Sequence, residues 1–353
     1  MSTVYISSNN GILSDKEDIL YYEDYKGNKV KLLPDKIKQL VLIGRTTITS
    51  GAFSLLFANH IEVAFLNKNG KYSGRLAYSD KKNTLIRHLQ HEVYDDKERS
   101  LSIAKDIVRG KLHNQYLFLQ RIGRKTGDPC KRIKNTLRDF TRVRQFLECA
   151  SSIEEVRGFE GDGSKLYFSC FGMNINSGWA TFNGRSKNPP LDPVNSVLSF
   201  LYTVLANRIG SYVSRSGLDS GIGNLHALSY GRDSLIFDLI EEFRTPLVDT
   251  LTCALFNMYI LKKDHFRIET VNEIYEDEKM LEQISDGGRD AVLLNEDGCK
   301  RVLDQFEKKL SETHFYPYLG RVLTYEKIID EQVKLYKQVI GGMLDHYLPL
   351  IVT

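Results

Sequence analysis

The stretch that decides the architecture of this chain is DPVNSVLSFLYTVLANRIGSYV, residues 192–213. It opens with Asp192 and Pro193, a typical helix start, because an aspartate side chain caps free backbone amides and proline fits the first helical position. The residues that follow, 194–213, are apolar on nearly every side of a helix. This pattern predicts a central helix that is buried within a helical domain.

Two apolar stripes at helical spacing precede this helix, at residues 101–119 and 133–147, with a loop expected at 123–129. A further helical region is expected at residues 300–340. The acidic segment 238–244 is also expected to be helical and to break or kink at Pro246, because proline lacks the amide that a helix interior needs. Most of the chain after about residue 80 is therefore predicted to be helical.

Residues 1–76 have a different pattern. Short β-branched or aromatic runs such as Val30-Lys31-Leu32-Leu33 alternate with turn sequences such as Asn9-Asn10-Gly11. Several short strands with frequent turns are typical of a small sandwich. The predicted fold class is α+β: a small N-terminal β-sandwich domain at residues 1–80, followed by a larger all-α domain at residues 81–353.

Composition places the chain among cytoplasmic globular proteins. Apolar residues make up 42% and charged residues 26% of the 353 residues, which is ordinary for such proteins. No run approaches the roughly 18 apolar residues of a membrane span, and the N-terminus does not resemble a signal peptide. We therefore expect no membrane association. The five cysteines are scattered without a Cys-x-x-Cys pair, so we expect reduced thiols and no zinc site.

The distribution of charge says more than the net charge of +3. Residues 97–144 contain fourteen lysines and arginines against four acids, whereas residues 269–297 contain ten acids against two basic residues. Such asymmetry concentrates positive potential on one part of the surface. Long surface helices that simply carry lysine and arginine would give the same pattern.

Three segments contain residues suited to metal chemistry: Glu160, His226, and the acidic turn with Asp238, Glu241 and Glu242. Carboxylate oxygens with one imidazole suit Mg²⁺ or Mn²⁺ better than a closed zinc site. A metal of this kind near basic surface usually serves phosphodiester chemistry. The chain has no Gly-x-Ser-x-Gly elbow, phosphate-binding loop or dinucleotide-binding glycine pattern.

Each of these segments also has a structural interpretation. A histidine after a glycine-rich turn more often makes a structural hydrogen bond, and an isolated glutamate such as Glu160 has no special meaning. The acids at 238–242 would ordinarily form a solvated helix face. Against that, clustered acids repel one another unless a cation lies among them, and Arg232 or Arg244 could supply it.

Taken together, several segments resemble one family, the CRISPR-associated adaptation integrases (the Cas-one family). The segments that carry the resemblance are, in chain order, 61–75, 107–115, 157–168, 189–195, 217–226 and 234–244. The departures from the family pattern, at Asp162, Gly163-Ser164, Ser220-Gly221 and Asn224, alter neighbours of the site residues and leave those residues in place.

This resemblance implies a metal site and an activity. Glu160, His226 and Glu241 match the family's metal ligands, and Asp238 lies one turn away as an auxiliary acid. The implied cofactor is Mn²⁺ or Mg²⁺. The implied reactions are DNA cleavage and a strand transfer in which the 3′-hydroxyl of a captured DNA fragment attacks a phosphodiester of the CRISPR array.

The resemblance also implies partners. The family acts on double-stranded DNA as a homodimer formed through the β-domain, and works with a small ferredoxin-like CRISPR-associated partner (Cas-two). The basic stretch 97–144 would then contact duplex phosphates. Seven basic residues are candidates for DNA binding: Arg121, Arg124, Lys125, Lys131, Arg132, Arg232 and Arg244.

Two other interpretations remain open. The chain could be a catalytically silent DNA-binding scaffold of the same fold, although the retention of all three ligand types favours an enzyme. It could also be a stand-alone transposon relative, which would be expected to carry an added DNA-binding module. No such module is expected after Gly341-Gly342.

Overall fold

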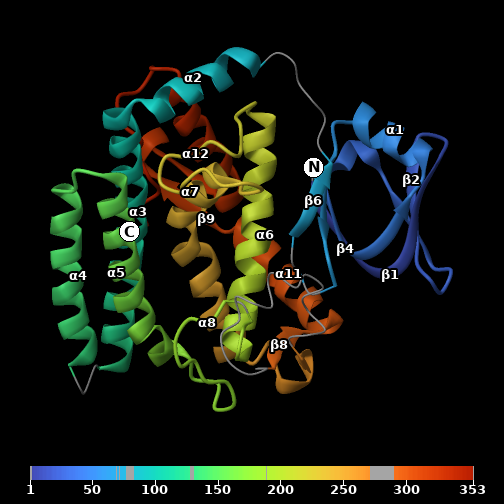
Figure 1. The fold of residues 1–353 in the computed structure, drawn as a ribbon. Coiled ribbons are helices and arrows are strands. Elements are labelled where there is room, and N and C mark those ends of the chain that lie inside the picture. Colours follow the sequence, from blue (N-terminus) through green and yellow to red (C-terminus); the bar gives the residue numbers. More distant parts are fainter. Residues whose placement is uncertain are drawn as a thin grey trace. The chain divides into compact units, whose positions relative to one another are not determined.

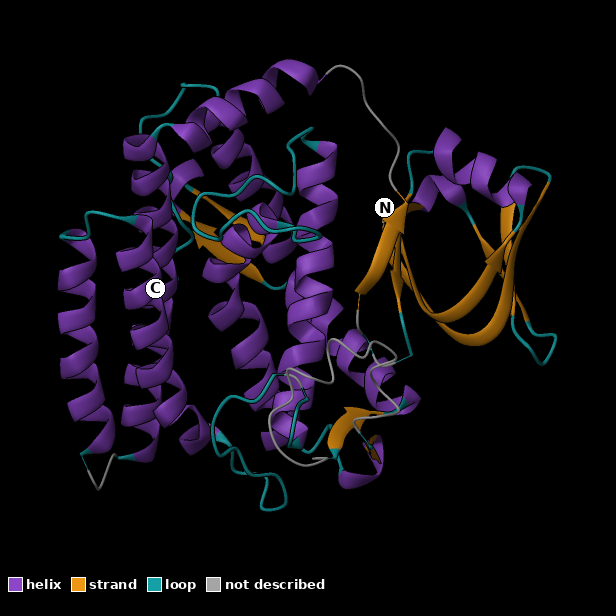
Figure 2. Cartoon of the chain, viewed as in Figure 1, coloured by secondary structure: helices purple, strands orange, loops and turns teal. Residues whose placement is uncertain are grey.

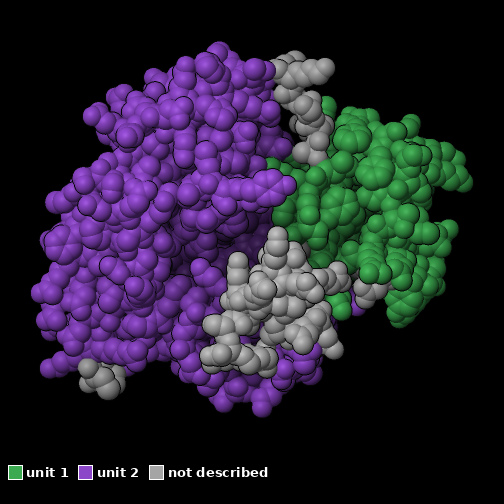
Figure 3. All heavy atoms as spheres, in the orientation of Figure 1, with its two compact units in different colours: residues 1–81 green, residues 82–353 purple. Residues whose placement is uncertain are grey.

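The computed structural model describes residues 2–68, 70, 72–76, 83–127, 131–187, 189–270 and 290–352. The chain divides into two compact units, residues 1–81 and 82–353 (Figure 3). Most of the acid-rich stretch noted in the sequence, residues 271–289, lies outside the described residues.

The first unit is built on one sheet. Its elements are β1 (Ser2–Lys16), β2 (Ile19–Glu23), β3 (Lys29–Leu32), β4 (Ile37–Ile48), α1 (Ser50–Ala58), β5 (Glu62–Leu66) and β6 (Tyr72–Leu76), with a 3₁₀ turn at Pro34–Lys36. The strand order is β3-β2-β1-β4-β5-β6. The β1–β4 and β4–β5 pairs are parallel and the other pairs are antiparallel.

The predicted β-sandwich is not confirmed, because all six strands belong to one curved sheet (Figure 1). Helix α1 makes the crossover between the parallel strands β4 and β5, as a parallel pair requires. Its Ala52 and Leu56 join Leu13, Leu40 and Val63 in a single core cluster. Helix α1 therefore covers apolar surface of the sheet, where the sequence pattern predicted a second sheet.

The second unit is mainly helical (Figure 2). Its helices are α2 (Thr84–Asp95), α3 (Lys97–Thr126), α4 (Arg132–Glu148), α5 (Ile153–Phe171), α6 (Pro193–Arg215), α7 (Ser234–Phe243), α8 (Thr250–Asn257), α11 (Glu296–Ser311) and α12 (Tyr325–Ile340). A π-helical segment, Arg244–Asp249, joins α7 to α8, and 3₁₀ turns occur at Gly172–Asn174, Lys263–His265 and Pro317–Leu319.

Helix α6 confirms the central helix expected from the sequence. The Asp192 side chain accepts a hydrogen bond from the amide of Asn195 and caps the helix, and Pro193 is its first residue. Fifteen of its 23 residues are buried. Even Arg208 is buried, where it pairs with Glu307 and Glu326. No helix among the described residues is long and apolar enough to cross a membrane.

The prediction of an all-α second domain was wrong. Two short antiparallel pairs interrupt it: β7 (Phe266–Glu269) with β8 (Ala291–Leu294), and β9 (Thr313–Tyr316) with β10 (Arg321–Thr324). The second hairpin divides the helix expected at 300–340 into α11 and α12. Pro317 and Gly320 make the turn, and Gly320 has a φ of 59°, in the left-handed region that favours glycine.

The last residues of the chain pack against α3 and α7. The Asn114 amide donates hydrogen bonds to the carbonyls of Glu242 and Leu350, at 2.9 Å each. The Glu242 carboxylate accepts from the Leu350 amide at 2.6 Å and the Tyr347 hydroxyl at 2.7 Å. A β-carbon added to Gly110 would lie 2.5 Å from Pro349 Cβ. The C-terminal segment and α3 therefore approach too closely for any side chain at Gly110.

We expect Gly110→Ala to destabilise the protein by about 1–3 kcal/mol, because overpacking must displace Pro349. Gly158→Ala on α5 is the matched control, since an added β-carbon there meets nothing within 4 Å. The control should be neutral or up to about 1 kcal/mol more stable, because alanine favours helices. Urea unfolding would measure both variants. Equal stability of the two variants would contradict the close contact.

Candidate functional site

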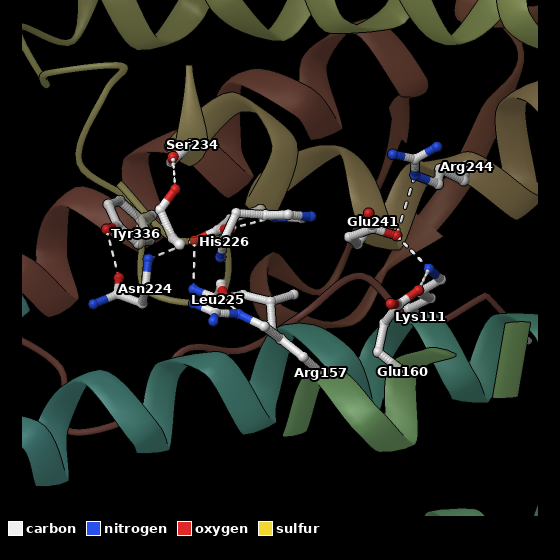
Figure 4. Close-up of polar contacts among 12 residues, drawn as sticks. Lys111, Arg157, Glu160, Asn224, Leu225, His226, Ser234, Glu241, Arg244 and Tyr336 are labelled. Carbon is white, nitrogen blue, oxygen red and sulfur yellow. Dashed lines mark hydrogen bonds and ion pairs between the residues drawn. The ribbon is translucent and has the colours of Figure 1, made fainter. Parts of the chain in front are cut away.

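Three helices meet at one buried lysine (Figure 4). The Lys111 ammonium on α3 forms ion pairs with Glu160 of α5 and with Glu241 of α7, at 2.7 Å from Glu241 Oε2. The Lys111 and Glu241 side chains are only 6% and 4% exposed. Lys111 reaches this position because it is flanked by Val108 and Leu112, both fully buried, on the inner face of α3.

The charges of this cluster support one another. Burial raises the pKa of the Glu241 carboxyl, but the positive charges of Arg244 and Lys111 outweigh it and hold that pKa at about 2. Burial lowers the pKa of Lys111, and Glu241 and Glu160 more than compensate. Glu241 is therefore a carboxylate and Lys111 an ammonium at neutral pH. Ser164 Oγ donates a further hydrogen bond to Glu160 Oε1 at 2.9 Å.

Glu241 also faces Arg244, which begins the π-helical segment. Arg244 Nε lies 3.1 Å from Glu241 Oε2, yet both atoms are buried and neither forms a hydrogen bond of normal geometry within the described residues. An ionised carboxylate oxygen with incomplete hydrogen bonding is suited to a bound cation. The chemistry of this oxygen suits a hard divalent ion, but the Lys111 ammonium already lies 2.7 Å from the same atom.

Asp238 holds the loop that carries His226. Its Oδ1 accepts hydrogen bonds from His226 Nδ1 at 2.7 Å and from the His226 amide at 2.9 Å. Its Oδ2 accepts from the amides of Asn224 at 2.5 Å and Leu225 at 2.9 Å. A β-carbon on Gly223 would lie 2.6 Å from Asp238 Oδ2, so this turn requires glycine.

The Asp238 contact decides which nitrogen of His226 is available. A carboxylate at Nδ1 places the proton on that nitrogen and leaves the Nε2 lone pair for a metal or a proton. The imidazole is 21% exposed. Arg157 Nε of α5 donates to the Leu225 carbonyl at 2.5 Å, and the Tyr336 hydroxyl donates to Asn224 Oδ1 at 2.7 Å. Asp238 of α7 thus holds the imidazole, and contacts from α5 and α12 hold the loop that carries it.

The structure brings the predicted site residues together in part. Glu160 and Glu241 meet at Lys111, whereas Asp238 is occupied by the His226 loop. His226 lies close enough to Glu241 for the two side chains to interact electrostatically. Among the described residues, no group of three histidine, cysteine, aspartate or glutamate side chains is placed to hold a metal ion. The Lys111 ammonium lies between the two carboxylates instead.

The three acids of α7 are all buried, so the interpretation as a solvated face was wrong. Each acid has a different set of partners: Asp238 has the His226 loop, Glu241 has Lys111, and Glu242 has the C-terminal segment. Arg244, one of the two arginines expected as partners of these acids, does pair with Glu241.

The seven basic candidates fall into separate places. Five lie where α3 ends and α4 begins: Arg121, Arg124, Lys125, Lys131 and Arg132. Arg124 lines a groove between these helices together with Tyr116, Lys134 and Arg138. Arg132 instead donates to the Ser169 carbonyl at 2.7 Å. Arg232 lies over the ring of Phe237, 5.4 Å from its centroid, and Arg244 belongs to the buried cluster.

Sequence reasoning missed Lys111. This residue lies within the segment 107–115, and its signal was a charged residue beside the apolar stripe of α3.

We expect Lys111→Met to destabilise the protein by about 3–5 kcal/mol at neutral pH, because the buried Glu241 carboxylate and the partly buried Glu160 carboxylate would lose the cation between them. The double variant Lys111→Met/Glu241→Gln should recover most of this loss. Lys165→Met is the control, since Lys165 pairs with Asp162 at 3.5 Å on the surface, where it is 83% exposed and such pairs contribute little. Urea unfolding would measure all three. Equal losses in the single and double variants would contradict the charge cluster.

Comparisons with known proteins agree on a family. A family model described as CRISPR associated protein Cas1 matches residues 4–308. The chain is 30% identical over 355 residues to a protein named CRISPR-associated endonuclease Cas1 from Clostridium perfringens, covering 99% of both.

Two solved structures share the fold. One, a casposase bound to integration product, has a TM-score of 0.84 at 18% identity, with 100% of this chain and 95% of that chain covered. The other, a Cas6-RT-Cas1–Cas2 complex, has a TM-score of 0.81 at 21% identity, with 99% of this chain and 36% of that chain covered. At these identities the likeness concerns the fold alone.

Proposed function

Because this chain belongs to the CRISPR-associated Cas1 family, we propose that it is a metal-dependent DNA endonuclease and integrase that inserts new spacer DNA into CRISPR arrays. The observation that carries the proposal is the meeting of Glu160 and Glu241, from different helices, at a single buried cation site beside His226. Two ionised carboxylates this close repel one another unless a positive charge lies between them.

Glu160, Glu241 and Nε2 of His226 would hold Mg²⁺ or Mn²⁺. When bound, the ion would lower the pKa of an attacking 3′-hydroxyl or water and neutralise charge on the phosphate. Lys111 competes with such an ion for the same carboxylates, because its ammonium already lies between them. Asp238 would not bind the ion itself; it fixes the orientation of the His226 imidazole through the hydrogen bond to Nδ1. No covalent enzyme nucleophile is needed for this chemistry.

We also propose three partners: double-stranded DNA, a second copy of this chain joined through residues 1–80, and a small Cas2-like protein. The similarity to a solved structure that is a Cas6-RT-Cas1–Cas2 complex supports the last. The groove lined by Arg124, Lys134 and Arg138 supports a path for duplex phosphates, and contacts of this kind are sensitive to salt and independent of sequence.

The alternative is a catalytically silent DNA-binding scaffold of the same fold. The presence of all three ligand types, at Glu160, His226 and Glu241, favours the enzyme.

Strand transfer of a 3′-hydroxyl duplex into a supercoiled plasmid bearing a CRISPR array tests the activity, with Mn²⁺, Mg²⁺ or EDTA and with and without the small partner. We expect product only with metal, and a loss of at least roughly 10²-fold in Glu160→Ala and His226→Ala. Asp162→Ala, an exposed acid on the same helix as Glu160, should retain activity.

DNA affinity should change little in these variants, because most of the binding free energy comes from contacts to other phosphates of the duplex. Wild-type rates in either variant would remove that residue from the site. Salt-sensitive DNA binding without transfer in any metal would favour the scaffold.

Asp238→Asn tests the orientation of His226 without a DNA substrate. An asparagine amide would face the backbone amides that Asp238 now accepts from, and the imidazole would lose its carboxylate partner. We expect Mn²⁺ to bind about 10–100-fold more weakly by calorimetry, as with other partners of metal-binding histidines. Asp219→Asn, which changes an acid bonded to Gly221 in the same loop, is the control. Unchanged Mn²⁺ affinity in Asp238→Asn would mean that His226, as Asp238 orients it, does not bind the metal.

A further inference from the structure

The ring of Tyr202, on α6, supports the guanidinium of Arg244. The Cζ atom of Arg244 lies 4.5 Å from the centroid of this ring, which is the arrangement of a cation–π contact. Arg244 Nε also lies 3.1 Å from Glu241 Oε2 (Figure 4). Only one residue therefore separates Tyr202 from a carboxylate that the proposed function assigns to the metal.

The π-helical segment Arg244–Asp249 explains how both of its ends reach this tyrosine. A π-helix bonds residues that are five positions apart, so its first residue, Arg244, and its last, Asp249, lie about one turn apart on the same side of the helix. Asp249 Oδ1 accepts a hydrogen bond from the Tyr202 hydroxyl at 2.5 Å. One end of the segment thus holds the hydroxyl of Tyr202, and the other end lies against its ring.

Asp249 is itself fixed within the core, where it is only 1% exposed. Its Oδ2 accepts hydrogen bonds from the Tyr167 hydroxyl at 2.8 Å and from Thr245 Oγ1 at 3.1 Å. Tyr167 belongs to α5, the helix that carries Glu160. Because both carboxylate oxygens have donors, Asp249 cannot turn without breaking several hydrogen bonds. The position of the Tyr202 ring is defined in consequence.

The contact with Tyr202 determines which way Arg244 faces. A guanidinium often matches a carboxylate through two parallel hydrogen bonds. Arg244 does not do so with Glu241, because Arg244 Nε and Glu241 Oε2 are both buried and neither has a hydrogen bond of normal geometry within the described residues. Arg244 therefore places its charge beside Glu241 without using the carboxylate as a hydrogen-bond acceptor.

We propose that Tyr202 is a positioning residue for the metal ligand Glu241. Its ring restrains Arg244 from turning into a two-pronged pair with Glu241, which would occupy the oxygen lone pairs that a divalent ion needs. Lys111, the other cation beside Glu241, is a single charge on a flexible stem and has no such fork. The inference rests on the proposed function, since it concerns the availability of one of its metal ligands.

Calorimetric titration of the protein with Mn²⁺ tests this role. In Tyr202→Leu the guanidinium of Arg244 can turn and pair with Glu241, so we expect Mn²⁺ to bind roughly 10-fold more weakly, as when other partners of metal ligands are changed. Adding Arg244→Met should restore the wild-type affinity, because the competing fork is gone. Adding Arg185→Met should not restore it, although the Arg185 guanidinium lies 5.6 Å from the same ring centroid.

A loss of affinity that persists in Tyr202→Leu/Arg244→Met would overturn the proposal, because a general disturbance of packing would then explain the loss. Tyr212 offers a matched control on the same helix. Its ring lies 4.4 Å from Arg215 Cζ and its hydroxyl donates to Glu326, so Tyr212→Leu removes the same kinds of contact. We expect this control to lose stability and keep its Mn²⁺ affinity. An equal loss of affinity there would also count against the proposal.

A second pair of variants tests the ring without removing its volume. Tyr202→Phe keeps the ring and should retain most of the Mn²⁺ affinity. Replacing Tyr202 with trifluorophenylalanine keeps the shape of the ring but withdraws electrons from its face, which weakens the attraction for a cation. We expect this variant to bind Mn²⁺ more weakly than Tyr202→Phe, and Arg244→Met to cancel the difference. Equal affinities of the two aromatic variants would overturn the proposed restraint.

Unfolding of the metal-free protein separates this inference from the proposed function. Urea unfolding of Arg244→Met, Glu241→Gln and the double variant gives the coupling between Arg244 and Glu241. This coupling, as a factor in the unfolding equilibrium constant, should be roughly 10-fold larger in a Tyr202→Leu background, because a charged hydrogen-bonded pair forms there.

A wild type that binds neither Mn²⁺ nor Mg²⁺, with the larger coupling in Tyr202→Leu, would remove the proposed metal site while supporting the restraint on Arg244. The same coupling in both backgrounds would overturn the restraint, even in a protein that binds metal and transfers strands.

Discussion

The ion pairs of Lys111 with Glu160 and Glu241 are the interaction on which the second unit depends. Removing three charged groups from water costs free energy that is recovered only if they meet with good geometry. They come from α3, α5 and α7, so these helices must pack in one relative position for the charges to meet. The packing that lets these charges meet also places the carboxylates of Glu160 and Glu241 next to each other.

Helix α7 connects this cluster to the rest of the unit. Asp238 fixes the His226 loop through three backbone amides and the imidazole. Glu242 holds the C-terminal segment, which also packs against Gly110, one residue before Lys111. Burial raises the pKa of Glu242 to about 7, although Gln332, Tyr347 and the Leu350 amide donate hydrogen bonds to it. The site is therefore held by polar contacts that lie within the core.

Local patterns predicted the elements near the site well where one residue type dominates. The cap at Asp192, the apolar run after it and the break at Pro246 are all found, the last as the π-helical segment 244–249. The short hairpins were missed because each strand has only four residues, too few to show a period. The sandwich was not confirmed, because strand patterns do not specify whether a helix or a sheet covers them.

The sequence by itself determined the order of the elements, the buried central helix and the residue types Glu160, His226 and Glu241, because spacing and chemical character are local properties. Only the tertiary structure decided their roles. It placed Lys111 between the carboxylates, turned Asp238 toward the His226 loop, and brought Arg185 and Arg244 to the same ring, that of Tyr202. These contacts join residues that are far apart in the chain, and such contacts depend on helix packing that no local pattern records.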